Sequence, residues 1–136
     1  MLIRLLYISR AVGAVTTTVT GSILETARLH NRVAGITGVL CQGQGLFIQI
    51  LEGERRAINR LYATLIKDKR HQDIELISIE EIETRKFPNW SMAHVIISES
   101  DPMVQLNHPE FDPYAASSEQ LKALIEDLLK QSTPIN

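Results

Sequence analysis

The chain has 136 residues, of which 44% are hydrophobic, and its formal net charge at pH 7 is −2. This length suits one domain with its own core, and the hydrophobic content excludes a wholly disordered chain. The sequence has no run of Lys and Arg and no stretch of about 20 apolar residues, which argues against nucleic-acid and membrane partners. A single cysteine, Cys41, excludes an internal disulfide bond. We therefore expect a soluble, cytoplasmic protein.

The first half of the chain alternates between apolar strands and one amphipathic helix. Residues 2–9 are apolar on both sides of the pleat, which predicts a central strand. Ser22 and Glu25 form a capping-box pattern that predicts the start of a helix, and a start near Thr18 is the alternative. Two further strands joined by a hairpin turn at "GQG" are predicted over residues 36–42 and 46–53.

The second half begins with the clearest helical pattern in the sequence. Residues 54–71 carry an apolar stripe at i, i+3, i+4 spacing and end in the charged run "KDKRH". Residues 74–82 and 91–97 predict two strands, separated by the turn "FPNW". After a loop marked by Pro102, Pro109 and Pro113, Ser117 and Gln120 form a second capping-box pattern. It predicts a C-terminal amphipathic helix with an apolar stripe at Leu121, Leu124, Ile125, Leu128 and Leu129.

The order of these elements predicts the fold class. The succession β-α-β-β-α-β-β favours an α+β, ferredoxin-like arrangement with both helices on one face of the sheet. The other face then needs a cover, and the C-terminal helix is the candidate for it.

Gln49 is the most informative single residue, because it lies in the otherwise apolar stretch "GLFIQILEG". Burying an amide without a partner costs roughly 1–3 kcal/mol, so we expect Gln49 to have one. If the first, third and last strands are neighbours, the side-chain period of two brings Tyr7 and Met92 toward Gln49 beneath the helices. The residues alone leave two interpretations open, a structural Tyr7–Gln49 bridge and a functional site.

Other polar residues also have two interpretations. Asn31 is either the C-terminal cap of the first helix or a binding residue. The run "KDKRH" is either a solvated helix end or a clamp for a phosphate-bearing tail, with Arg70 and His71 as donors. Trp90 and Met92 are otherwise expected to fill the core. The histidines lack metal-ligand spacing, so no metal site is predicted.

Five segments of the sequence together resemble the BLUF family of blue-light sensors that use flavin. They are "LLYIS", "ARLHNRVAGITGVL", "GLFIQILEG", "LIKDKRH" and "RKFPNWSM", in family order over residues 1–97. The resemblance implies a flavin held noncovalently between the two helices. FAD is the usual choice of the family, although FMN and riboflavin fit the same pocket. It also implies that Tyr7 is the photochemical electron and proton donor and that Gln49 changes its hydrogen bonds after excitation.

The same resemblance assigns further residues to the flavin and to the signal. It implies that Asn31 holds the pyrimidine end of the ring. It also implies that the ribityl and phosphate side is bound by Asp68, Arg70 and His71. Trp90 and Met92 match two residues whose exchange between inward and outward positions is proposed to relay the signal. Contacts with the flavin are also implied for Ile23, Phe47 and Leu65.

The function predicted from the sequence is therefore a photosensor without substrate turnover. Residues 1–97 are predicted to form the flavin-binding sensor and residues 98–136 an extension that signals to a protein partner or within a homo-oligomer. One alternative is a ligand-sensing module without photochemistry, in which Tyr7 and Gln49 are structural. Another is an acylphosphatase-type hydrolase, but the loop after the first strand offers Arg10 without a convincing phosphate cradle.

Overall fold

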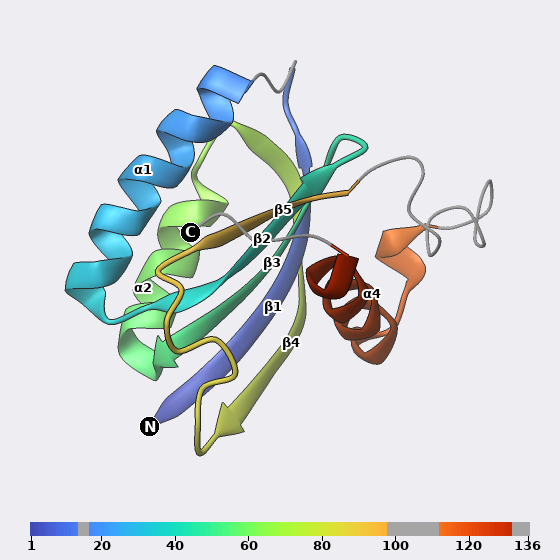
Figure 1. Ribbon diagram of the computed structural model, residues 1–136. Coiled ribbons are helices and arrows are strands. Elements are labelled where there is room, and N and C mark those ends of the chain that lie inside the picture. The colour runs from blue at the N-terminus through green and yellow to red at the C-terminus, as the bar shows by residue number, and fades with distance from the viewer. Residues whose placement is uncertain (14–16, 98–111, 132–136) are drawn as a thin grey trace.

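The fold is a five-stranded sheet with helices on both faces (Figure 1). The computed structural model describes residues 1–13, 17–97 and 112–131. The sheet order is β4-β1-β3-β2-β5, in which the first four strands are antiparallel and β5 runs parallel to β2. The predicted α+β, ferredoxin-like class is confirmed. The elements are β1 (Leu2–Ala11), α1 (Thr17–Ala34), β2 (Thr37–Gly43), β3 (Leu46–Glu54), α2 (Arg55–Ile66), β4 (His71–Ile82), β5 (Ala93–Ile96), the 3-10 turn η1 (Pro113–Ala115) and α4 (Ser118–Gln131).

The sheet separates two hydrophobic cores. Helices α1 and α2 cover one face, here called the pocket face, and α4 covers the other, here called the α4 face (Figure 1). Alternate residues of β3 belong to different cores, because Phe47 and Leu51 pack toward α1 and α2 while Ile48 and Ile50 pack toward α4. The C-terminal helix therefore covers the second face, as the sequence predicted.

Two local sequence signals are confirmed in detail. In the hairpin between β2 and β3, Gln44 and Gly45 have φ values of 54° and 74°, as a tight two-residue turn requires. At the start of α4, the Ser117 backbone N–H donates to Gln120 Oε1 at 2.9 Å. The Gln120 backbone N–H donates in return to Ser117 Oγ at 3.1 Å, which completes the capping box.

Two helix boundaries differ from the prediction. Helix α1 begins at Thr17, so the start at Ser22 is wrong and the alternative start near Thr18 is the better description. Helix α2 ends at Ile66 and not within the run "KDKRH". The physical reason is that His71 pairs with Ala11 of β1, so the chain must leave the helix in time to join the sheet.

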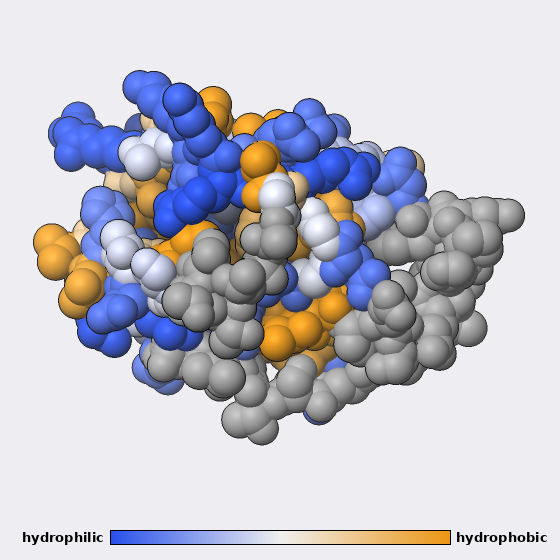
Figure 2. Space-filling view, turned by 90° about the horizontal axis from the view of Figure 1, so that it is seen from above, coloured by the Kyte–Doolittle hydropathy of each residue, from blue (hydrophilic) through white to orange (hydrophobic). Residues whose placement is uncertain are grey.

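The last strand, β5, is not a neighbour of the strand that carries Gln49, contrary to the assumption made from the sequence. β5 pairs with β2, from Val39↔Ala93 to Gln42↔Ile96, and therefore lies at the edge of the sheet. The predicted proline-marked loop falls largely within residues 98–111, which lie outside the described residues. On the face seen from above, hydrophobic side chains form separate groups among hydrophilic ones (Figure 2).

Two glycines provide a test of this packing. A Cβ at Gly38 of β2 would clash with the backbone carbonyl oxygen of Ile50, whereas a Cβ at Gly21 of α1 would meet nothing within 4 Å. We expect Gly38→Ala to lower the free energy of unfolding by roughly 1–3 kcal/mol through overpacking. Gly21→Ala should raise it by about 1 kcal/mol through helix propensity. Urea unfolding followed by circular dichroism measures both, and equal effects of the two changes would contradict the described approach of β2 to β3.

Candidate functional site

Tyr7, Gln49 and Met92 meet on the pocket face of the sheet. Tyr7 of β1 pairs directly with Gln49 of β3, so both side chains point to the same face. The Tyr7 hydroxyl donates to Gln49 Oε1, and Gln49 Nε2 donates to Met92 Sδ at 3.1 Å. All three side chains are buried. The expected convergence of a phenol, an amide and a thioether is confirmed, although Met92 reaches Gln49 from just before the edge strand β5.

The surroundings of Tyr7 keep its phenol protonated. Burial raises the pKa of Tyr7 well above its usual value, and the negative charge of Asp68 raises it further. The ring also lies 6.0 Å from the Tyr62 ring, centroid to centroid, at an angle of 57°. Tyr7 is therefore a neutral hydrogen-bond donor with an aromatic neighbour.

A cavity opens above this network, between α1, the end of α2 and the sheet. It has about 520 Å³ of empty space, part of which is open to solvent. Apolar side chains form most of its lining, and polar groups are concentrated in the network below and at the turn after α2. The cavity brings together nine of the residues selected from the sequence, namely Tyr7, Ile23, Phe47, Gln49, Leu65, Asp68, Arg70, His71 and Met92.

Asn31 lies one helical turn beyond the cavity lining. It follows Ile23 and Ala27 at spacings of four residues, on the same stripe of α1. Its side chain is 1% exposed, and Nδ2 donates to the Ser91 carbonyl at 2.8 Å. Oδ1 is buried and has no hydrogen-bond partner among the described residues. The interpretation of Asn31 as a helix cap is wrong, because α1 continues to Ala34.

His71 is held in a defined orientation at the other end of the cavity. Its Nε2 donates to the Leu65 carbonyl at 2.6 Å, because a carbonyl can only accept. Its Nδ1 lies 2.7 Å from the hydroxyl of Ser9, which is fully buried. Ser9 was missed from the sequence, although it follows Tyr7 by the strand period of two.

Asp68 and Arg70 form an ion pair in the turn between α2 and β4. The Arg70 guanidinium donates to the Asp68 carboxylate at 2.5 to 3.1 Å, and the Arg70 backbone N–H donates to the same carboxylate at 2.9 Å. This pairing lowers the pKa of Asp68 below its usual value. The predicted clamp residue Arg70 thus reaches the cavity with its guanidinium paired to Asp68.

Trp90 lies apart from the cavity. It packs against the α4-face core and stacks on Phe87, with ring centroids 5.7 Å apart and an interplanar angle of 14°. Of the two residues assigned to the signal, Met92 therefore lines the cavity and Trp90 does not.

Three apolar lining residues were not selected from the sequence as site residues, namely Leu24, Ala27 and Leu40. Leu40 pairs with Gln49 across β2 and β3, a register that the sequence does not reveal.

The residues of this site fit a flavin. The mostly apolar lining, with a few polar groups at its floor and at one end, suits a planar ring system that carries a polar edge. The unpartnered Asn31 Oδ1 needs a donor, which the imide N–H of a flavin ring offers.

Within residues 1–13, 17–97 and 112–131, no cluster of His, Cys, Asp and Glu could hold a metal ion. None of the helices in these ranges is long and apolar enough to cross a membrane.

Known proteins resemble this chain in sequence and in fold. Photoactivated adenylate cyclase subunit beta from Euglena gracilis is 34% identical over 89 residues, which are 65% of this chain and 10% of the relative. The chain thus spans about a tenth of the length of the curated relatives it matches. The ground-state structure of BlsA superposes with a TM-score of 0.86 at 31% identity, covering 100% of this chain and 92% of BlsA.

A second solved structure and a family model complete the comparison. The dark-state structure of BlrB, a BLUF protein, has a TM-score of 0.76 at 29% identity and covers 96% of both chains. The model of the BLUF family, described as sensors of blue light using FAD, matches residues 2–93. The chain therefore belongs to the BLUF family of flavin-binding blue-light sensors.

Proposed function

We propose that this chain is a blue-light photoreceptor in which Tyr7 and Gln49 carry out the primary photochemistry without substrate turnover. The observation that carries the proposal is the chain of hydrogen bonds from the Tyr7 hydroxyl through Gln49 to Met92. It lies at the floor of a cavity that fits a flavin. Gln49 has one firm partner, the phenol, and one weak acceptor, the thioether sulfur. Such an amide can exchange its partners at low cost.

The proposed cofactor is FAD. Ile23, Phe47 and Leu65 would pack against the ring, and Asn31 Oδ1 would accept from the imide N–H at the pyrimidine end. The ribityl and phosphate groups would contact the turn that contains Asp68, Arg70 and His71, because these residues line the cavity and Arg70 is exposed. Binding of a phosphate there would compete with Asp68 for the Arg70 guanidinium.

The residues of the network have complementary parts in the proposed reaction. A bound flavin, once excited by blue light, supplies an electron acceptor. Tyr7 would give up one electron to that acceptor, and its acidified hydroxyl would release a proton to Gln49 Oε1 along the existing hydrogen bond. Gln49 would pass a proton from Nε2 on toward the cofactor, and the electron and a proton would return to Tyr7 as the dark state recovers. Gln49 then rotates or tautomerises, so that a donor replaces the former acceptor. If the amide rotates, Nε2 leaves Met92 Sδ, and the position preferred by Met92 changes.

The proposed output runs through the last strand. Met92 directly precedes β5, and Ala93 and Val95 of β5 pack in the α4-face core. In this proposal residues 1–97 form the sensor and residues 98–136 the output extension. The extension acts on a protein partner or on another copy of the chain within a homo-oligomer.

The role of Tyr7 is tested by Tyr7→Phe, with Tyr62→Phe as the matched control on the neighbouring ring. The protein is purified or reconstituted with FAD, and its absorption is recorded in the dark and under blue light. We expect the wild type and Tyr62→Phe to show a reversible red shift of the flavin band. Tyr7→Phe should keep the flavin and lose the shift, because it lacks the hydroxyl proton.

Three outcomes would contradict the proposal. A red shift that survives Tyr7→Phe would exclude Tyr7 as the donor. A protein that binds flavin without any light response would favour the ligand-sensing alternative. Release of the bound cofactor by heat, followed by chromatography, identifies it, and recovery of FMN or riboflavin alone would overturn the choice of FAD.

The protonation of Tyr7 gives a second prediction. Because burial raises the pKa of Tyr7, its phenol stays neutral when the pH reaches the ordinary tyrosine pKa of about 10. The amplitude of the light-induced red shift should therefore be the same at pH 7 and pH 10, as long as circular dichroism shows that the protein remains folded. An amplitude that falls by half at pH 10 would mean that Tyr7 titrates like an exposed tyrosine.

A further inference from the structure

Strand β3 contacts both ends of one short segment, residues 86–92, which leads into β5. On the pocket face, Gln49 donates to Met92 Sδ. On the α4 face, the Glu52 carboxylate accepts from the backbone N–H groups of Lys86 and Phe87. Gln49 and Glu52 are three residues apart, so the strand period points them to opposite faces. One end of the segment therefore contacts the amide of the proposed switch and the other end a carboxylate.

Of these two contacts, the one made by Glu52 is the stronger. Its side chain is 0% exposed, and Oε1 accepts from the Phe87 N–H at 2.8 Å while Oε2 accepts from the Lys86 N–H at 3.0 Å. Arg4 Nε also donates to Oε2 at 2.8 Å, and the terminal Nη2 of Arg4 lies 2.8 Å from the same oxygen in an ion pair. Bonds to a charged acceptor are stronger than a neutral amide's bond to a thioether. The contact of Gln49 with Met92 is thus the weaker one.

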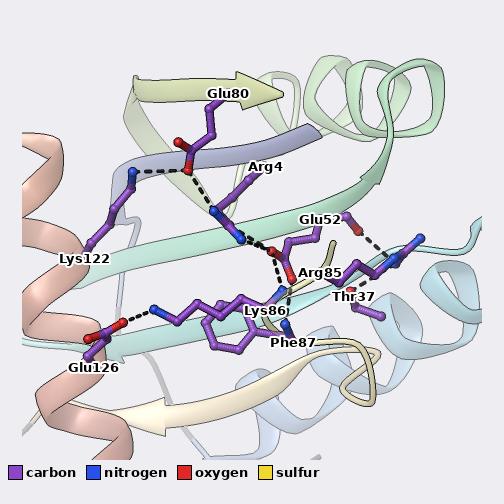
Figure 3. A network of polar contacts seen from close by, with 9 residues as sticks. All are labelled: Arg4, Thr37, Glu52, Glu80, Arg85, Lys86, Phe87, Lys122 and Glu126. Carbon is purple, nitrogen blue, oxygen red and sulfur yellow. Dashed lines mark hydrogen bonds and ion pairs between the residues drawn. The ribbon is translucent and has the colours of Figure 1, made fainter. Parts of the chain in front are cut away.

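A wider set of charges braces the Glu52 end (Figure 3). Arg4 lies between Glu52 and Glu80 on three adjacent strands and donates to Glu80 at 2.9 Å. Lys122 of α4 pairs with Glu80 at 3.2 Å. Lys86 forms a further ion pair with Glu126 of α4. The Glu52 end is therefore fixed to the sheet and to α4.

The middle of the segment is also attached to the sheet. Phe87 stacks on Trp90, and the Trp90 carbonyl accepts from the Gly38 N–H of β2 at 2.9 Å. Beyond Trp90, the carbonyls of Ser91 and Met92 accept from Asn31 and Arg28, which belong to α1. Residues 91–92 are therefore attached to α1, and residues 86–90 are attached to the sheet.

We propose that Glu52 is a positioning residue that fixes residues 86–87 as an anchor, so that displacement at Met92 is transmitted to β5. The proposal rests on the photochemical function proposed for Tyr7 and Gln49. Without the anchor, the start of the segment would lose its bonds to the Glu52 carboxylate while Trp90 stays bonded to Gly38, so residues 86–89 would absorb part of the displacement. With it, the displacement must pass to Ala93 and Val95, whose side chains pack in the core beneath α4.

The wild-type holoprotein provides the direct test. Amide hydrogen exchange, measured by NMR in the dark and under blue light, compares the two ends of the segment. We expect the Lys86 and Phe87 amides to keep the same protection in both states, while Ala93 and Val95 change at least about tenfold in exchange rate. An equal change at Lys86 and Phe87 would overturn the anchor. Unchanged rates at Ala93 and Val95 would overturn it as well.

Variants of Glu52 test whether the carboxylate is the cause. Glu52→Gln removes the charge, Glu52→Asp shortens the reach to the backbone, and Glu54→Gln is the control in an exposed ion pair with the N-terminus. Both Glu52 variants should keep the red shift and reduce the light-dependent change at Val95 from about tenfold to about twofold or less. Glu54→Gln should behave like the wild type.

The outcomes separate the two proposals. A full light-dependent change at Val95 in a folded Glu52 variant would overturn the role of Glu52 and leave the photochemistry intact. Loss of the red shift in the wild type would overturn both proposals. If neither Glu52 variant folds, the wild-type exchange rates at residues 86–87 and 93–95 still decide for or against the anchor.

Discussion

The site depends on the pairing of β1 with β3. Tyr7 stands directly opposite Gln49, in a register that runs without interruption from Leu2↔Glu54 to Arg10↔Leu46. A slip of one residue would turn Gln49 toward α4 and separate it from the phenol. The hairpin turn at Gln44 and Gly45 and the two apolar faces of β3 oppose such a slip. The Tyr7–Gln49 pair is thus placed by the core of the protein and not by a loop.

Strand β3 carries a polar residue on each of its buried faces, and the two have different physical characters. A buried polar group is tolerated only when it has partners. Glu52 has several charge-assisted donors that fix it in one arrangement. Gln49 has a neutral phenol and a thioether, and the thioether sulfur is only a weak acceptor. The difference in partners makes one residue suitable as a fixed point and the other as a switch.

The periodic parts of the sequence predicted the elements and part of the site. The stripe of α2, the capping box of α4 and the apolar runs of β1 and β3 are local signals, and the structure contains each of these elements. The resemblance to the BLUF family supplied Leu65 and further site residues, whereas the strand period alone brought Tyr7 and Gln49 together. Their hydrogen-bond partners follow from register and could be only partly foreseen.

The features that the sequence did not predict depend on contacts between distant segments. Helix α2 ends at Ile66 because His71 pairs with β1, which no local pattern records. Met92 faces the cavity and Trp90 the opposite core because the irregular segment before β5 is held by Glu52 and Gly38. The start of α1 lies in a Thr- and Gly-rich stretch, where helix propensity is weak and the local pattern does not single out the first residue.

The way α4 is held limits how a signal can leave the sensor. Leu121, Leu124, Ile125 and Leu128 are each at most 1% exposed, and burying one such side chain contributes roughly 1.5–3 kcal/mol. Exchanging the partners of a single amide changes the free energy by only about 0.5–1.5 kcal/mol per hydrogen bond. A switch can bias an equilibrium by no more than the difference it makes between two states. A rearrangement at Gln49 is therefore too weak to detach α4 from the sheet, and in the proposed mechanism β5 would shift against a helix that stays in place.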